Sequence, residues 1–322
     1  MKAIRIQESG GPEVLEYLEV ADLKPGENQI LVQVEAAGVN FIDTYHREGL
    51  YPVELPFTPG IEAAGLVLEA GSGVTGFRPG ERVVYCLNIG SYAEQALVDQ
   101  SKAVHLPDKV GLDEGVAAMC QGMTAHYLTT DCYSVKPGDV ALVHAAAGGV
   151  GLLLVQMVKL AGGRVIGTVS TEEKAQLALG VGADHVIRYV HEDFETEVSR
   201  LTEGEGVDVV YESVGKATFA KSLNCLKPRG YLVLFGQSSG PVEPFDPQIL
   251  NQKGSLFITR PSLFHYVATR SEFEKRAGAV LEMIETDQIS ITIGDRLKLS
   301  EAEEAHRRLE GRKTTGKILL VP

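Results

Sequence analysis

A run of small residues at 145–151, AAAGGVG, carries the strongest chemical signal in the sequence. It follows an apolar segment at 140–145 that is typical of a buried parallel strand, and apolar residues then recur at the spacing of a helix face. Glycines between a strand and a helix let the backbone approach a pyrophosphate, and the N–H groups of the helix N-terminus attract its charge. We predict a dinucleotide site rather than a plain tight turn, with contacts from Ala147, Gly148, Gly149, Val150 and Gly151.

Residues after the next predicted strand, 164–169, bear on which dinucleotide would bind. An NAD site usually has an acidic residue there to bind the ribose 2′-hydroxyl. Here Ser170 follows the strand, and acidic residues come only in the next helix, predicted at 172–180. Ser170, Lys174 and Tyr189 offer a hydroxyl, an ammonium and a phenol, which suit a 2′-phosphate. We therefore expect NADP(H), although Lys174 could also be an ordinary exposed helix lysine.

The elements that must position this site alternate between strands and helices from about residue 123 to 261. Further strands are predicted at 185–189, 207–211, 231–235 and 255–259, which gives an α/β fold with a doubly wound parallel sheet of six strands. Ligands of such sheets bind at the carboxyl ends of the strands. Phe235, Gly236, Ser238 and Arg260 follow the last two strands, and Arg312 lies near the end of the chain. We predict that they contact the cofactor, the alternatives being a plain loop and surface charges.

The flanking regions have a different pattern. Residues 1–122 contain short strands, such as 30–36 and 64–70, separated by Pro-Gly pairs, which indicates a barrel-like β domain. Near the end, an amphipathic helix is predicted at 271–286, and residues 300–303 have the spacing of a capping box for a helix that ends at Gly311. The strand at 317–321 has no helix of its own. We expect it to complete the first domain, which gives domains of 1–122 with 262–322, and 123–261.

Composition excludes several classes of protein. Of 322 residues, 44% are hydrophobic and 23% charged, which fits neither a disordered chain nor a coiled coil. The net charge of −13 argues against nucleic acid as a partner. The four cysteines form no CxxC pair, the N-terminus lacks the apolar core of a signal peptide, and the apolar stretch at 150–158 is too short to span a bilayer. We expect reduced thiols in a cytoplasmic protein.

Short motifs spread over the whole chain add a resemblance. They are GGPEVL at 10–15, AGVNFID at 37–43, YP at 51–52, PFTPGIEAAG at 56–65, VKPGD at 135–139, the glycine run at 145–151, FGQSSG at 235–240 and TGK at 315–317. In these motifs the sequence resembles the medium-chain dehydrogenase/reductase superfamily, and more narrowly the NADPH:quinone oxidoreductase (zeta-crystallin-like) family. The resemblance implies a GroES-like catalytic domain, a Rossmann domain, a cleft between them for NADPH and a quinone, and usually a homodimer.

The resemblance also implies roles for individual residues. The segment of Asn40 and Phe41 would line the cofactor, and Asn40, Asp43 and Tyr45 would face the nicotinamide ribose, the ring and the substrate carbonyl. Tyr51 would stand beside an aromatic acceptor, and Thr124 would contact the nicotinamide. Other interpretations remain open: Asn40 and Asp43 are good caps for a helix start, and Tyr51 and Thr124 could serve only in packing.

Departures from the wider superfamily concern the metal. Zinc alcohol dehydrogenases carry a cysteine ligand where this chain has Asn40, and a histidine where it has Ile61. Ile61 cannot bind a metal, and Asn40 is a poor substitute for a thiolate. We therefore predict no zinc, which disfavours alcohol oxidation and favours reduction of an electron-poor acceptor. Two alternatives to quinone reduction remain: an NADPH-dependent enone or 2-alkenal reductase, and a crystallin-like or RNA-binding protein that binds the nucleotide with secondary activity.

Overall fold

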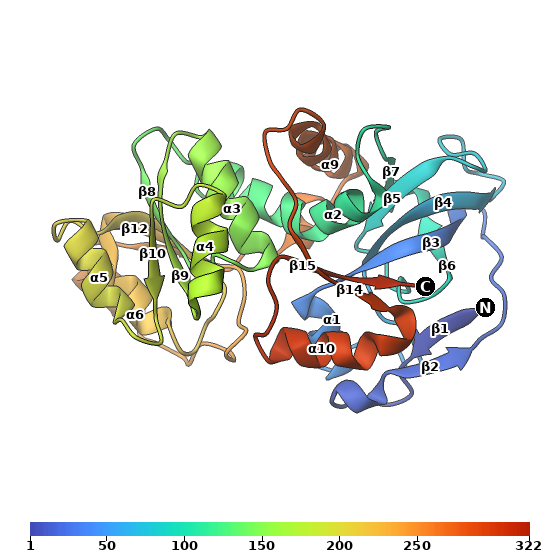
Figure 1. Cartoon of the computed structure of the whole chain (residues 1–322), viewed down its shortest axis with the longest axis horizontal. Helices are drawn as coiled ribbons and strands as arrows, with labels where there is room; N and C mark the ends of the chain where they lie inside the picture. The colour runs from blue at the N-terminus through green and yellow to red at the C-terminus, as the bar shows by residue number, and fades with distance from the viewer. The chain divides into compact units, whose positions relative to one another are not determined.

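The computed structural model describes residues 1–322, which form two compact units (Figure 1). One unit contains Met1–Met123 together with Val267–Pro322, and the other contains Thr124–Tyr266. The first unit therefore consists of both ends of the chain, and the expected divisions near residues 122 and 262 fall close to these bounds. No helix is both long and apolar enough to cross a membrane.

The second unit is built on a parallel sheet. Its strands, in the order in which they lie side by side, are β10 (His185–Arg188), β9 (Arg164–Val169), β8 (Val140–Val143), β11 (Val207–Glu212), β12 (Leu226–Leu234) and β13 (Phe257–Thr259). Every neighbouring pair is parallel. The predicted six-stranded, doubly wound sheet is thus confirmed. It forms because long apolar runs with helical stretches between them can be buried in few other ways.

One strand begins earlier than predicted. β12 starts at Leu226 rather than at Tyr231, since Leu226 already pairs with Val207 before the register shifts and Tyr231 pairs with Val209. Between them lie Pro228 and Arg229, and Arg229 has a φ of 64°. Proline has no N–H to donate to a neighbouring strand, so the segment forms an irregular bulge. The sequence of this bulge resembles that of a turn.

Helices of the second unit connect these strands. They are α3 (Gly149–Leu160), α4 (Glu172–Gly180), α5 (Phe194–Leu201), α6 (Phe219–Asn224), α7 (Gln248–Gln252) and α8 (Leu263–Tyr266), and a π-helical turn spans Leu128–Cys132. The helix predicted at 172–180 is confirmed. The core beneath α5 and α6 contains Leu142, Ile166, Val210 and Leu232, all almost fully buried.

The first unit contains a larger, mixed sheet. Its main path is β14 (Ile293–Lys298), β15 (Lys317–Val321), β3 (Gln29–Val39), β4 (Glu62–Ala70), β5 (Arg82–Cys86) and β7 (Ala103–His105), with β6 (Gln95–Asp99) paired to β3. A separate ribbon joins β1 (Lys2–Arg5) to β2 (Glu16–Glu19). The last strand pairs with β3 over residues 37–39, so the prediction that it completes the N-terminal domain is confirmed.

Helices of the first unit are α1 (Phe41–Arg47), α2 (Leu112–Tyr127, which runs into the second unit), α9 (Arg270–Glu285) and α10 (Ala302–Glu310). Short 3-10 turns lie at Pro12–Val14, Gln100–Lys102 and Leu299–Glu301. The capping box predicted at 300–303 is wrong: the Lys298 N–H donates to Glu301 at 2.8 Å, so the box begins two residues earlier. Leu299 and Ala302 are buried, which fixes where this helical segment begins. Gly311 ends α10 as predicted.

Candidate functional site

The glycine loop lies between β8 and α3. Gly148 is the N-cap of α3, and Ala145 has a φ of 51°, in the left-handed region. A Cβ at position 151 would overlap the backbone carbonyl oxygen of Ala145, so only glycine is compatible with this turn. The first N–H groups of a helix have no acceptor within the helix. The loop therefore provides free donors and a positive dipole end, which fit a pyrophosphate.

A second loop follows β12 at the same edge of the sheet. The N–H groups of Phe235 and Gly236 donate to the Glu212 carbonyl oxygen at 2.9 and 3.3 Å, and the Ser238 N–H donates to the Ser213 carbonyl at 3.2 Å. A Cβ on Gly236 would lie 2.7 Å from that Ser213 oxygen. The segments after β11 and β12 are thus closely packed. Three residues predicted from the sequence lie here, and Arg260 follows β13 at the same edge.

The residues predicted to bind a 2′-phosphate lie at the ends of β9 and β10. Ser170 follows β9, and the Tyr189 N–H donates to the Val169 carbonyl at 3.1 Å, so both residues are near the ends of neighbouring strands. Thr171 caps α4, and its hydroxyl accepts from the Lys174 N–H at 3.3 Å. Tyr189 is 41% exposed. The three residues lie on neighbouring segments, and their contact with a 2′-phosphate stays a prediction.

Glu212, at the end of β11, is a residue that sequence reasoning missed. Its side chain is fully buried, and one carboxylate oxygen accepts from the Val214 N–H at 2.7 Å, the Gly215 N–H at 3.1 Å and the Thr218 hydroxyl at 2.9 Å. The carboxylate therefore shapes the loop that packs against Gly236. Its only sequence signal is an acidic residue that ends an apolar strand.

His144 lies beside this carboxylate. Its Nδ1 is 2.9 Å from the Thr168 hydroxyl and its Nε2 is 2.9 Å from the Ser222 hydroxyl. Ser222 donates in turn to Glu212 at 2.7 Å. Burial lowers the pKa of His144. His144 is therefore a buried packing residue, and both of its ring nitrogens have hydrogen-bond partners.

In the first unit, Asn40 belongs to a buried ionic cluster. Its Nδ2 donates to the Glu62 carboxylate at 2.7 Å, and its Oδ1 accepts from the Lys317 ammonium at 2.8 Å. Lys317 also forms an ion pair with Glu62, and both side chains are at most 1% exposed. An ammonium can only donate, so the orientation of the Asn40 amide is fixed. Asn40 is the N-cap residue of the capping box that starts α1, and its amide also binds both partners of the ion pair.

Asp43 is the other member of this capping box. Its Oδ2 accepts from the Asn40 N–H at 2.8 Å and from the Tyr92 hydroxyl at 3.0 Å, while its Oδ1 is buried without a hydrogen-bond partner. Burial raises the pKa of Asp43 to about 7, although the two hydrogen bonds and Lys317 oppose the shift. The observed contacts of Asp43 thus fit the interpretation that it caps a helix start. Its contact with substrate stays a prediction.

A chain of hydrogen bonds continues from Tyr92 to Arg47. The guanidinium can only donate, so the Arg47 contact of 3.1 Å makes Nδ1 of His306 an acceptor. The His306 Nε2–H then donates to the Tyr92 oxygen at 3.2 Å, and Tyr92 donates to Asp43. Burial and Arg47 lower the pKa of His306 to about 3. Since Arg47 does not release a proton and is held by Glu310 at 2.8 and 3.1 Å, this chain is a scaffold that joins α1 to α10.

The two tyrosines predicted to meet an acceptor lie together. The Tyr45 and Tyr51 ring centroids are 5.4 Å apart in an edge-to-face arrangement, and the Tyr51 N–H donates to the Tyr45 carbonyl at 3.1 Å. Tyr51 is 38% exposed. Of the other predicted residues, Phe41 begins α1, Thr124 lies on α2 and Arg312 follows α10 with a φ of 56°. Their contacts with a cofactor stay predictions.

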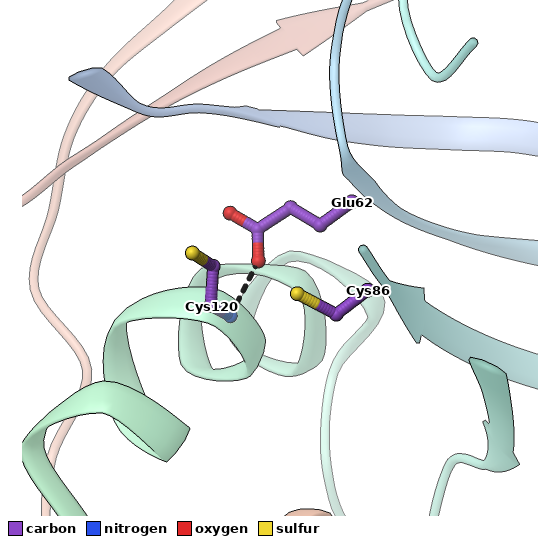
Figure 2. A group of neighbouring side chains, drawn as sticks. All are labelled: Glu62, Cys86 and Cys120. Carbon is purple, nitrogen blue, oxygen red and sulfur yellow. Dashed lines mark hydrogen bonds between the residues drawn. The ribbon is translucent and has the colours of Figure 1, made fainter. Parts of the chain in front are cut away.

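A possible metal-binding group lies next to the ionic cluster. Ligand atoms of Glu62, Cys86 and Cys120 all lie within 4.8 Å of one another (Figure 2). The Cys120 N–H donates to Glu62 at 2.6 Å. Burial and the neighbouring Cys120 raise the pKa of Cys86 well above its usual value. The sequence did not point to this group, because the three residues are far apart along the chain.

Comparisons with known proteins agree with this architecture. The GroES-like domain model of alcohol dehydrogenases matches residues 26–108, and the zinc-binding dehydrogenase model matches residues 149–281. Quinone oxidoreductase of Pseudomonas aeruginosa is 45% identical over 100% of this chain and 99% of that protein. A 2-haloacrylate reductase of a Burkholderia species is 43% identical over 98% of each. The structure of Escherichia coli quinone oxidoreductase complexed with NADPH matches with a TM-score of 0.97 and 43% identity over 100% of both chains.

The GroES-like unit, the parallel nucleotide-binding sheet and these matches define a medium-chain dehydrogenase/reductase with a Rossmann domain. The similarity to quinone oxidoreductases extends over the full length of the chain. Within the superfamily, the chain belongs to the quinone oxidoreductase family.

Proposed function

We propose that this protein is an enzyme that reduces quinones with NADPH. The observation that carries the proposal is the full-length similarity, at 43–45% identity, to quinone oxidoreductases, one of which is solved with NADPH. The glycine loop and the N-terminus of α3 fit the phosphates of that cofactor. The nicotinamide supplies the hydride when NADPH is bound.

The second unit binds and orients the cofactor in this proposal. Ala147 and residues 148–151 hold the pyrophosphate, and Ser170, Lys174 and Tyr189 surround the 2′-phosphate. The backbone of residues 235–238 passes the nicotinamide ribose, and Arg260, Arg312 and Thr124 supply further contacts. Support comes from the common position of the loops after β8, β11 and β12 at the carboxyl edge of the sheet.

Residues of the first unit orient the acceptor in this proposal. Tyr45 and Tyr51 present neighbouring aromatic rings to a flat quinone. Asn40 and Phe41 line the nicotinamide, and Asp43 acts by holding the Asn40 backbone. A quinone product can take its protons from solvent, so no dedicated acid is required.

A panel of acceptors tests the reaction. NADPH oxidation is measured with 1,4-benzoquinone, 9,10-phenanthrenequinone, a simple enone and 2-chloroacrylate. We expect the quinones to have the highest kcat/KM. A higher value for the enone or the haloacrylate would support the alternative suggested by the 2-haloacrylate reductase relative. Tight NADPH binding without turnover of any acceptor would instead contradict an enzymatic role.

Lys174 provides a test of cofactor choice. The Lys174→Ala variant is expected to raise KM for NADPH about fivefold to tenfold, because a charge-assisted bond to the 2′-phosphate is worth about 1 kcal/mol or more. KM for NADH should stay unchanged, since NADH lacks that phosphate. Lys159→Ala is the matched control and should change neither value, because Lys159 lies at the C-terminal end of α3, away from the glycine loop. An equal loss with both cofactors would refute the assigned role.

A cytoplasmic homodimer completes the proposal. The family resemblance supports the dimer, and four cysteines without a disulfide support a reducing compartment. The net charge of −13 disfavours a nucleic-acid partner. Sedimentation should give about twice the chain mass of 34.7 kDa, and a species of single mass would contradict the dimer.

A further inference from the structure

Three side chains from different elements converge inside the first unit (Figure 2). Glu62 begins β4, Cys86 ends β5 and Cys120 lies on α2, and their ligand atoms are all within 4.8 Å of one another. Glu62 and Cys86 are fully buried, and Cys120 is partly exposed. Neither cysteine forms a disulfide. The group is therefore a pair of neighbouring thiols with one accessible side and a carboxylate beside it.

The carboxylate is already committed to other partners. One Glu62 oxygen accepts from the Asn40 amide and the Lys317 ammonium, and the other accepts from the Cys120 N–H. Coordination of a metal by Glu62 would require Lys317 to lose its buried partner, which is costly for an ammonium with 1% exposure. Only the two sulfur atoms are left as ligands.

We propose that Cys86 and Cys120 form a two-sulfur binding site for a soft divalent metal ion of the mercuric type, and that Lys317 makes this site selective against zinc. Thiolate–metal bonds are about 2.3 Å long for zinc, so two of them span at most about 4.6 Å. The two sulfur atoms lie no more than 4.8 Å apart, so both can bind one ion.

Charge balance selects a divalent ion. Each thiol loses its proton to solvent and forms one sulfur–metal bond, so two protons leave for each ion bound and nothing is oxidised or reduced. The dication with two thiolates is neutral, as the two thiols were before. The Glu62–Lys317 pair beside it is also neutral, whereas a monovalent ion would leave an uncompensated buried negative charge.

Zinc has different requirements. It prefers four ligands in a tetrahedral arrangement, and protein sites supply at least three of them. Here Glu62 is held by Lys317 and is not free to bind a metal, and no histidine belongs to the group. The predicted absence of zinc thus has a physical basis in the ligand set itself.

Metal retention in the presence of a competing monothiol tests the site. The full-length protein is incubated with one equivalent of Hg²⁺ and dialysed against excess 2-mercaptoethanol, which removes mercury from single thiols but not from a chelating pair. We expect about one mercury per chain in the wild type and in the control variant Cys132→Ala/Cys225→Ala, which keeps only this pair. Cys86→Ala and Cys120→Ala should each retain at least tenfold less.

Two further readouts do not depend on how well the variants fold. Wild-type protein with less than one equivalent of Hg²⁺ should release two protons per ion, and one proton per ion would overturn the chelate. The same dialysis with Zn²⁺ should leave no metal on the wild type, and a stoichiometric zinc ion would overturn the role of Lys317. Full mercury retention by both single variants, or none by the wild type, would refute the site. None of these readouts depends on the proposed activity.

Discussion

Replacing Lys317 with methionine is expected to lower the free energy of unfolding by about 3–5 kcal/mol. The ammonium is 1% exposed and is bound by Glu62 and by the Asn40 amide at 2.8 Å. Methionine fills a similar volume but leaves the Glu62 carboxylate buried without a counter-charge, and a single buried charge costs far more than a missing contact. Urea unfolding followed by circular dichroism, together with calorimetric melting, measures the loss.

A second substitution separates the charge effect from packing. In the double variant Glu62→Gln/Lys317→Met no buried charge remains, so we expect it to recover more than half of the lost stability. Lys298→Met is the matched control, because Lys298 lies in the neighbouring strand β14 and is exposed. Its effect should stay within about 0.5 kcal/mol. A loss below 1 kcal/mol for Lys317→Met would contradict the expected cost of leaving Glu62 buried without a counter-charge.

Asp43→Asn is expected to change the pH dependence of stability by as much as about 4 kcal/mol between pH 4 and pH 8. Burial raises the pKa of Asp43 from 3.8 to about 7 in the folded protein. A raised pKa means that its contribution is fully present below pH 4 and is lost as the pH rises to about 7, because the unfolded chain loses its proton first. Each unit of pKa shift corresponds to about 1.4 kcal/mol.

The variant cannot lose this proton, and its amide oxygen can still accept a hydrogen bond from Asn40 or Tyr92. The unfolding free energy of Asp43→Asn minus that of the wild type should therefore rise steadily from pH 4 to pH 7 and then level off. Asp99→Asn is the matched control: hydrogen bonds to Ser101 lower the pKa of Asp99, so Asp99 titrates below pH 4 and its stability difference should stay flat over this range. A difference that stays constant over this range would show that Asp43 keeps an ordinary pKa.

Local patterns in the sequence determined most of the second unit. The six strands, the helix at 172–180 and the glycine loop were all predicted within a few residues, because apolar runs and glycine positions specify an alternating fold without knowledge of distant partners. The exception was the start of β12, where Pro228 and Arg229 resemble a turn and only pairing with β11 reveals the strand.

The resemblance of the sequence to a known family also identified Asn40, Asp43, Tyr45 and Tyr51 as candidates. It could not show that Asp43 would be buried or that the Asn40 amide would be held by an ion pair. The partners of these residues, Tyr92 and Lys317, are 49 and 277 positions away along the chain.

Only the tertiary structure decided which charged residues are buried together. Glu62 and Lys317 are separated by 255 positions, and Arg47 and Glu310 by 263. Charged residues usually lie at the surface, so a sequence pattern assigns them there by default. The pairing of β15 with β3 overrides that default, because it brings Lys317 beside a carboxylate that makes its burial tolerable.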